Sequence, residues 1–236
     1  MEENYFRVNP DKINQNYFSL NKAESNHFLK SLRGNIGDEI WLLDGLGIAY
    51  KGLICSINDE CISGDIINSF NDYGEPNYNI NLIIGLIKGK RMDLLLEKAT
   101  ELGVKSIQPL ALDNCVKTKL NQDRGEKIII SAAKQAGRSF FPTLHEITGL
   151  QDWLNAHTGE FSILCHYNSK DSMLRIIEKK QNSINIIIGP EGDFSERELD
   201  LFKKTKIQSV NLSSRRLRSE SAAIVSIANV NQIMEN

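Results

Sequence analysis

Two short segments in the C-terminal half bring together residue types that could bind a ligand. The first is 189–192, with the sequence Gly-Pro-Glu-Gly, and it follows the apolar run 184–188. Ser195 and Glu198 come next with capping-box spacing, so a helix is expected to start there. Glycine lets a ligand approach the backbone closely, and free N–H groups at a helix start could bind a carboxylate or a polar adenine edge. An ordinary strand–turn–helix joint is the simpler interpretation, but four constrained positions in a row favour a ligand-binding loop.

The second segment, 212–223, places three arginines and one glutamate among small residues before the last predicted helix. The arginines are Arg215, Arg216 and Arg218, and arginine makes bidentate contacts to phosphate while staying charged. Glu220 would lie at the start of that helix, where a negative charge is favoured, so capping is the alternative to a catalytic role. A second basic run, 88–91, also lies at a strand-to-helix junction. Basic runs are often only solvated surface, but this junction is the edge at which open α/β sheets bind ligands.

Common nucleotide-binding and metal-binding motifs are absent from the sequence. No G-x-G-x-x-G follows any predicted strand, and 85–91 lacks the spacing and the Ser/Thr of a P-loop. No H-E-x-x-H occurs, and no two cysteines have the short spacing of a zinc site. We therefore expect no metal. The four cysteines, Cys55, Cys61, Cys115 and Cys165, are interpreted as scattered thiols.

The elements that must position these segments change character near the polar stretch 71–76. Before it, short β-like segments and one helix starting after Asn21 predict a small β-barrel or sandwich; the strands are 5–8, 39–44, 48–57 and 61–67. After it, apolar strands alternate with helical patterns, which predicts an α/β domain with a buried parallel sheet. The expected strands are 79–87, 106–112, 161–167, 184–188 and 210–212, and the expected helices are 91–102, 124–136, 170–180, 195–204 and 221–234.

Length and charge fit this division. The chain has 236 residues, enough for one large domain or two small ones. Up to Tyr73 there are 6 Lys/Arg and 11 Asp/Glu, and from Gly74 onward there are 22 and 19, which sum to the net charge of −2. This balance neither requires nor excludes nucleic acid. No apolar run is long enough to span a bilayer, and the start of the chain has no apolar signal segment, so we expect a cytoplasmic protein without a membrane partner.

The motifs, taken together and in order, carry a family resemblance. Residues 189–192 and 217–222 resemble the paired C-terminal signature of the bacterial 16S ribosomal RNA uracil-N3 methyltransferases, which belong to the SPOUT class. Supporting matches are 91–93 with 97–104, 135–138, and Arg33 with Gly37 and Asp38. The sequence departs from the family at two positions, since Asp193 and Ser213 stand where the family usually has glycine.

The resemblance implies a fold, a cofactor and a partner. The fold would be a PUA-like RNA-binding β-barrel at 1–73 and a SPOUT methyltransferase domain with a trefoil knot at 74–236. The cofactor would be S-adenosylmethionine, the substrate the 16S rRNA of the small ribosomal subunit, and the working form a homodimer. The protein would act in rRNA processing and ribosome biogenesis.

The resemblance also implies roles for individual residues. Arg218 would hold the uracil oxygens or an RNA phosphate, and Glu220 would accept the N3 proton, directly or through water. His166 would line the cofactor pocket, although a strand residue satisfied by a neighbour is the alternative. The full set of cofactor residues is His166, Gly189, Pro190, Glu191, Gly192, Leu212, Ser213, Leu217 and Ser221, and the RNA-binding set is Arg7, Arg33, Lys90, Arg91, Arg138 and Arg216.

Two other functions remain open at this point. One is a non-catalytic dimeric RNA-binding protein with a degenerate SPOUT domain, which would need a filled or broken cofactor pocket. The other is a SPOUT methyltransferase that acts on another RNA position, such as a ribose 2′-oxygen or a tRNA base. The exact target nucleotide, and whether free rRNA or the assembled subunit is the substrate, are not predicted.

Overall fold

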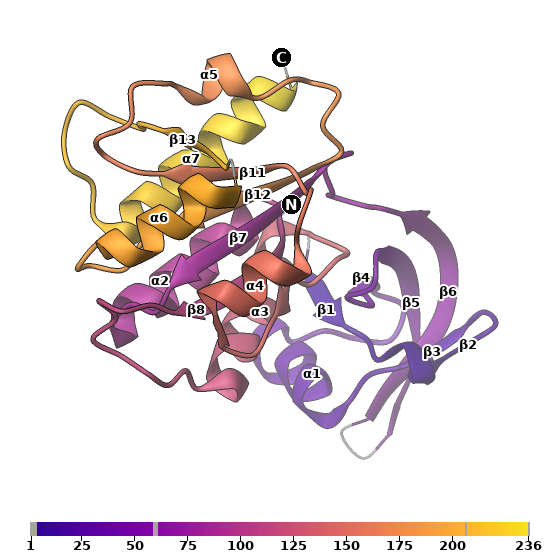
Figure 1. Ribbon diagram of the computed structural model, residues 1–236. Coiled ribbons are helices and arrows are strands. Elements are labelled where there is room, and N and C mark those ends of the chain that lie inside the picture. The colour runs from indigo at the N-terminus through magenta and orange to yellow at the C-terminus, as the bar shows by residue number, and fades with distance from the viewer. Residues whose placement is uncertain (1–3, 59–60, 206, 236) are drawn as a thin grey trace. The chain divides into compact units, whose positions relative to one another are not determined.

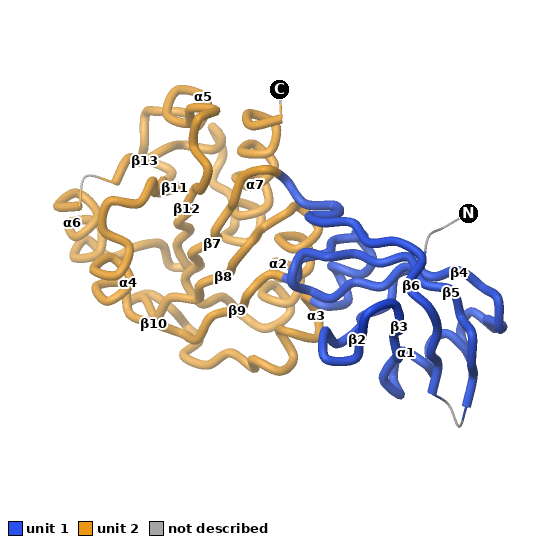
Figure 2. Tube along the Cα trace, turned by 90° about the vertical axis from the view of Figure 1, so that its right-hand side faces the viewer, with its two compact units in different colours: residues 1–76, 130–141 blue, residues 77–129, 142–236 orange. Residues whose placement is uncertain are grey.

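The computed structural model describes residues 4–58, 61–205 and 207–235. Contacts within the chain divide it into two compact units, shown in different colours in Figure 2. Unit 1 comprises Met1–Pro76 and Ile130–Phe141, and unit 2 comprises Asn77–Ile129 and Pro142–Asn236. The change from unit 1 to unit 2 falls at the end of the polar stretch, while the return of 130–141 to unit 1 has no counterpart in the sequence pattern.

Unit 1 is built on a curled, mixed sheet of six strands in the order β1-β4-β5-β6-β3-β2 (Figure 1). β1 and β4 are parallel and the other neighbours are antiparallel. Alternate side chains such as Phe6, Phe18 and Leu42 fill its core. The four predicted strands are confirmed, and two short ones are added; the strands are β1 (Tyr5–Arg7), β2 (Ile13–Asn14), β3 (Tyr17–Ser19), β4 (Glu39–Leu43), β5 (Ile48–Asn58) and β6 (Cys61–Asn71).

The helical segments of unit 1 are short. A 3₁₀ turn, η1, covers Pro10–Lys12. The helix α1 (Lys22–Asn26) starts as the sequence indicates, because the Asn21 side chain accepts a hydrogen bond from the backbone N–H of Glu24 at 3.0 Å. It continues as the π-helix η2 (His27–Leu32), which ends at Arg33 in the left-handed conformation with φ 54°.

Unit 2 contains a seven-stranded sheet in which every pairing is parallel, as expected. The path is β10-β8-β7-β12-β11-β13, with β9 beside β8. The central strands are apolar and buried on both faces, as shown by Ile186, which pairs with Leu82 and Ile163. The strands are β7 (Asn79–Gly85), β8 (Val104–Ala111), β9 (Thr143–Leu144), β10 (Thr148–Gly149), β11 (Ser162–Cys165), β12 (Ser183–Ile188) and β13 (Gln208–Val210).

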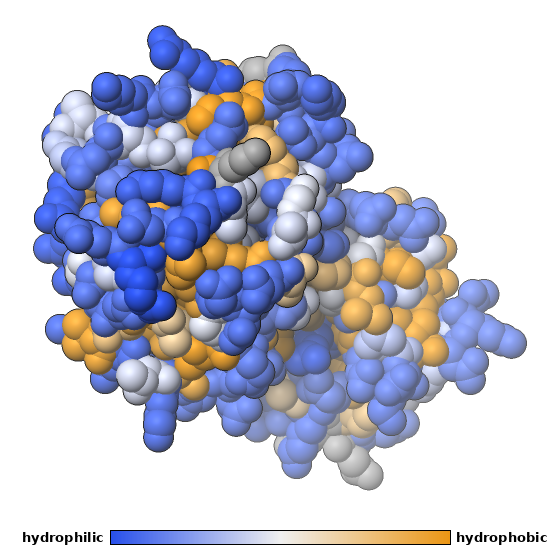
Figure 3. Space-filling view, in the orientation of Figure 1, coloured by the Kyte–Doolittle hydropathy of each residue, from blue (hydrophilic) through white to orange (hydrophobic). Residues whose placement is uncertain are grey.

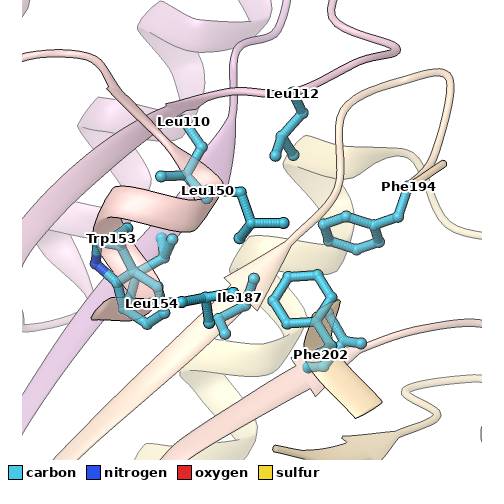
Figure 4. Close-up of a cluster of buried hydrophobic side chains, with 10 residues drawn as sticks. Leu110, Leu112, Leu150, Trp153, Leu154, Ile187, Phe194 and Phe202 are labelled. Atoms are coloured by element: carbon cyan, nitrogen blue, oxygen red, sulfur yellow. The ribbon is translucent and has the colours of Figure 1, made fainter. Parts of the chain in front are cut away.

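Helices cover both faces of this sheet (Figure 1). On one face α7 packs against α2 and the central strands, and on the other α4 and α6 enclose an apolar cluster that includes Trp153, Ile187 and Phe202 (Figure 4). The predicted capping box is confirmed at α6, where Ser195 and Glu198 exchange hydrogen bonds of 2.8 and 3.3 Å. The helices are α2 (Gly89–Glu101), α3 (Gln122–Ala136), α4 (Leu150–Ala156), α5 (Met173–Ile176), α6 (Glu196–Thr205) and α7 (Ser219–Glu235).

One predicted helix is wrong over most of its length. The pattern at 170–180 indicates a helix, but only Met173–Ile176 is helical. Asp171 instead pairs with Val210, and its carbonyl accepts a hydrogen bond from the Asn211 backbone at 2.8 Å. The start of the segment thus extends the sheet edge, which the helical pattern alone does not reveal.

One face of the molecule shows how polar and apolar side chains are distributed over the surface. On the face shown in Figure 3, hydrophilic side chains predominate and apolar atoms appear between them. Within the described ranges, no helix combines the length and the apolar character needed to cross a bilayer.

Candidate functional site

A cavity of about 360 Å³ lies at the carboxyl ends of β11, β12 and β13 in unit 2. Because these strands are parallel, their carboxyl ends meet at one edge of the sheet, where open α/β sheets bind ligands. Three strand-end segments and the start of α7 form its walls, and α2 adds one side chain. The lining residues are Arg91, Cys165, His166, Tyr167, Ile188, Gly189, Pro190, Glu191, Asp193, Asn211, Leu212, Ser213, Arg215, Arg216, Leu217, Arg218, Ser219 and Ala222.

The Asn211 side chain joins two of these walls. Its Nδ2 donates to the carbonyl of Tyr167 at 2.8 Å, and its Oδ1 accepts from the backbone N–H of Ser213 at 2.9 Å. The Ser213 hydroxyl in turn accepts from the backbone N–H of Arg215 at 3.1 Å. The segment after β13 is therefore held in shape by local hydrogen bonds, and Ser213 contributes to them. Sequence reasoning missed Asn211 and Tyr167, since neither belongs to a recognisable motif.

The glycines of the 189–192 loop are required mainly by packing within the protein. A Cβ at Gly189 would lie 3.0 Å from the Phe194 ring, and one at Gly192 would lie 2.8 Å from the Cβ of Asn114. Gly189 lines the cavity, whereas Gly192 does not. The expectation that ligand approach explains Gly192 is thus corrected, because a side chain there would meet Asn114 first.

Asp193 has a backbone conformation that favours glycine. Its φ is 62°, in the left-handed region, which accounts for the glycine that the related family usually has at this position. The Asp193 side chain reduces the cost by a local hydrogen bond, since its Oδ1 accepts from the backbone N–H of Phe194 at 2.9 Å.

Arg91 lies between two carboxylates, one from each of two distant segments. Its Nη1 is 3.5 Å from Oε1 of Glu191, and its Nε is 3.6 Å from Oε1 of Glu220. The backbone N–H of Lys88 also donates to Glu191 Oε1, at 3.1 Å. The second oxygen of each glutamate, Oε2, is buried and has no hydrogen-bond partner among the described residues. The described residues thus leave one acceptor on each carboxylate unsatisfied, which is costly for a buried polar group.

The remaining polar groups of the cavity differ in character. Within the described part of the chain, the guanidinium groups of Arg215, Arg216 and Arg218 have no ion-pair partner, so they remain available to an anion. Burial raises the pKa of the Cys165 thiol, so it forms a neutral part of the wall. The described residues include no group of three or more His, Cys, Asp and Glu side chains that could hold a metal ion.

The structure brings together most of the predicted cofactor residues. Those that line the cavity are His166, Gly189, Pro190, Glu191, Leu212, Ser213 and Leu217, together with Arg91, Arg216 and Arg218. Four other residues predicted for the site do not line the cavity in the described structure: Gly192, Ser221, Lys90 and Glu220. Glu220 is nevertheless linked to the cavity through Arg91.

The arginines expected to bind RNA are distributed between the two units. Arg7 and Arg33 lie exposed in unit 1. The position of Arg138 argues against the expected contact with RNA, because its side chain is only 2% exposed and pairs with Glu75 at 2.6 Å. This arginine therefore stabilises unit 1, and its place within a matching motif did not distinguish that role from RNA binding.

Comparison with known proteins adds independent information. Residues 74–231 match the family model described as the RNA methyltransferase domain. A protein of Rickettsia conorii named ribosomal RNA small subunit methyltransferase E is 29% identical to this chain, covering 98% of the chain and 96% of the relative. A protein of the same name from Mesomycoplasma hyopneumoniae is 28% identical, covering 93% of this chain and 96% of the relative.

A solved structure matches the whole fold. It is that of a ribosomal RNA small subunit methyltransferase E from Neisseria gonorrhoeae bound to S-adenosyl methionine. The TM-score is 0.90 at 27% sequence identity, and 98% of each chain is covered. The similarity thus extends over both units.

Proposed function

Because the chain belongs to the RNA methyltransferase domain family, we propose that it transfers a methyl group from S-adenosylmethionine to N3 of a uracil in 16S ribosomal RNA. The names of the relatives support the small-subunit rRNA as substrate. The choice of uracil N3 rests on the resemblance of 189–192 and 217–222 to the corresponding family signature. The observation that carries the proposal is the cavity at the strand ends, whose wall includes Glu191 with its buried, unpartnered Oε2.

The residues of the cavity fit the cofactor. Its volume of about 360 Å³ is within the usual range of small-molecule sites. The wall combines apolar side chains, such as Leu212 and Leu217, with the backbone of three loops. The unpartnered Oε2 of Glu191 gives the site a negative group suited to a cation. We assign the binding to His166, Gly189, Pro190, Glu191, Leu212, Ser213 and Leu217; when bound, S-adenosylmethionine supplies a methyl group activated by a positively charged sulfur.

The protein's own residues must present the base and remove a proton. N3 of uracil is hidden in a base pair, so the target base has to be unpaired or turned out of its helix. Arg218, exposed at the cavity wall, is assigned to the uracil oxygens or an adjacent phosphate. Glu220, in the first turn of α7, is assigned as the proton acceptor. Since Glu220 is not a lining residue, transfer through a water molecule fits the geometry better than direct contact.

The finer features of the fold belong to the same proposal. We propose that unit 1 is a PUA-like RNA-binding barrel, and its curled mixed sheet is compatible with this. We also propose a trefoil knot and a homodimer for unit 2, on the resemblance alone, and the cytoplasm as the location. RNA contacts are assigned to exposed cations without an ion-pair partner in the described structure, namely Arg7, Arg33, Lys90 and Arg216.

Calorimetric titration with S-adenosylmethionine tests the proposal. A ligand at about 100 times its Kd stabilises a protein by about 2.7 kcal/mol. In a chain of this length each kcal/mol raises the melting temperature by roughly 2–4 °C. Absence of both heat and thermal shift at millimolar cofactor would favour the non-catalytic RNA-binding alternative. Primer extension on rRNA from strains with and without the gene would then locate the modified nucleotide.

A further inference from the structure

The sequence predicts that Arg91 binds RNA, yet its surroundings are those of a different role. Its guanidinium contacts one oxygen of Glu191 and one of Glu220, at 3.5 and 3.6 Å. These two side chains are only 19% and 9% exposed, whereas Arg91 is 39% exposed. The partly exposed guanidinium of Arg91 therefore pairs with two nearly buried carboxylates.

The charge of this trio disfavours a phosphate. One guanidinium and two carboxylates carry a formal charge of −1, so an approaching phosphate would be repelled rather than attracted. The cavity wall offers better phosphate ligands in Arg215 and Arg216, which have no ion-pair partner in the described structure. A negative trio instead suits a cation or an N–H donor.

The trio also joins three elements that meet at the cavity. Arg91 lies in the first turn of α2, Glu191 lies in the loop after β12, and Glu220 lies in the first turn of α7. The backbone N–H of Lys88 adds a second link between α2 and Glu191. Arg91 therefore links the loop of residues 189–192, which we call the cofactor loop, to the start of α7.

We propose that Arg91 is a positioning residue that orients the Glu220 and Glu191 carboxylates and leaves one oxygen of each unpaired. This inference rests on the proposed methyltransferase function. Glu220 then receives the N3 proton in a fixed orientation, and Glu191 presents its unpaired oxygen to the positively charged part of the cofactor. Arg91 itself makes no essential contact with RNA.

The full-length Arg91→Met variant separates this role from a phosphate contact. The adjacent exposed residue gives a matched comparison, Lys90→Met. A lost phosphate contact reduces the slope of log binding constant against log salt by about one. We expect Lys90→Met to reduce this slope for rRNA binding by about one and Arg91→Met to leave it unchanged. A reduced slope for Arg91→Met would overturn the proposal.

Rate measurements provide the second arm. We expect the single-turnover rate of Arg91→Met at saturating cofactor and RNA to fall about 10- to 100-fold, less than the roughly 10²- to 10⁴-fold loss expected when a positioned acid or base is removed. In a Glu220→Gln background, Arg91→Met should lower the single-turnover rate only slightly further, because the effects of two residues that act through one group are not additive. Multiplicative losses in the double variant would contradict a role through Glu220.

Two controls keep the result interpretable. Arg91→Lys retains the charge but not the two-sided contact, so its rate should lie between wild type and Arg91→Met. If Arg91→Met is poorly folded in a melting experiment, the Lys variant decides, and a wild-type rate in it would overturn the proposal. Failure of the wild-type protein to bind S-adenosylmethionine or methylate rRNA would instead reject the proposed function itself.

Discussion

The side-chain amide of Asn114 donates a hydrogen bond to the carbonyl of Gly192 at 3.1 Å. The same Nδ2 also lies 3.0 Å from the carbonyl of Asp193. Asn114 follows β8, which is separated from β12 by β7, so it supports the 189–192 loop from a strand two positions away in the sheet. The shape of that loop therefore depends on a residue outside its own motif.

Substitution of Gly192 should damage the loop before it affects any ligand. In Gly192→Val the new side chain would collide with Asn114, because a Cβ at residue 192 would lie only 2.8 Å from the Asn114 Cβ. We expect a lower melting temperature without cofactor and loss of the shift caused by S-adenosylmethionine. Gly89→Ala is the matched control, because a Cβ there meets no atom within 4 Å, and its melting temperature should not fall. A Gly192→Val protein with normal stability but no cofactor shift would restore the simpler view that this glycine faces the ligand.

Glu220→Gln tests proton removal while keeping the shape of the side chain. If Glu220 accepts the N3 proton, the single-turnover rate should fall roughly 10²- to 10⁴-fold. Raising the pH should partly restore it, since hydroxide can take the proton. Cofactor affinity measured by calorimetry should barely change. If Glu220 only caps α7, the variant would lose about 0.3–1 kcal/mol of stability and keep its activity.

Two substitutions of Asp193 are predicted to change the stability of the protein by different amounts. Asp193→Val places a β-branched residue at φ 62° and removes the hydrogen bond to Phe194, so it should lose roughly 1–2 kcal/mol or more. Asp193→Gly relieves the backbone but adds freedom to the unfolded chain, so stability should change by less than about 1 kcal/mol. Thermal unfolding without cofactor compares the two. Equal losses would show that the side chain matters more than the backbone.

Arg138 should behave as a structural residue. It pairs with Glu75 through contacts of 2.6 and 3.2 Å, and both side chains are at most 6% exposed. Removing one member of a buried pair typically costs 3–5 kcal/mol, so Arg138→Met should destabilise the protein by about that amount in urea unfolding. Arg124→Met is the control, because its pair with Asp93 is at the surface, where ion pairs contribute little, so its stability should change much less. A small loss for Arg138→Met with a reduced salt slope would return this arginine to the RNA-binding set.

Asp113 gives the protein an acid-dependent contribution to stability. Hydrogen bonds from Arg197, and then from the Ser195 hydroxyl, hold the pKa of Asp113 below its usual value. Because the pKa of Asp113 is lower in the folded protein than in the unfolded chain, its charge stabilises the fold at pH values above the unfolded pKa of about 3.9. This stabilisation is lost as the pH falls through the lower pKa of the folded protein. The difference in melting temperature between wild type and Asp113→Asn should therefore be full at pH 6 and shrink below about pH 4. A difference independent of pH would mean that the charge of Asp113 is not involved.

Local patterns predicted the main elements of unit 2 because they are written in single stretches of sequence. The four isoleucines within residues 184–188 identify a strand buried on both faces, and Ser195 with Glu198 identifies the start of α6. The cofactor loop lies between these two signals, so its place at the sheet edge could also be predicted. The short strands β2, β3, β9 and β10 were not predicted, because two or three residues are too few to show an alternation of apolar and polar side chains.

Contacts between distant residues could not be obtained in this way. Arg91 and Glu191 are 100 positions apart, and Asn114 and Gly192 are 78 apart. Each pairing depends on how strand ends assemble, which the side-chain pattern of either segment does not encode. Arg138 illustrates the opposite error, since a motif match suggested RNA binding and only the fold reveals its burial.

The return of Ile130–Phe141 to unit 1 has a consequence for the order in which the protein is made. Glu75 is synthesised 63 positions before Arg138, its buried partner. At about 5–20 residues per second, the ribosome needs roughly 3–13 s to supply that partner. Throughout this interval the nascent unit 1 carries an uncompensated carboxylate where a buried ion pair will form. Unit 1 therefore cannot complete its packing until translation has passed through β7, α2, β8 and α3 and reached residue 141.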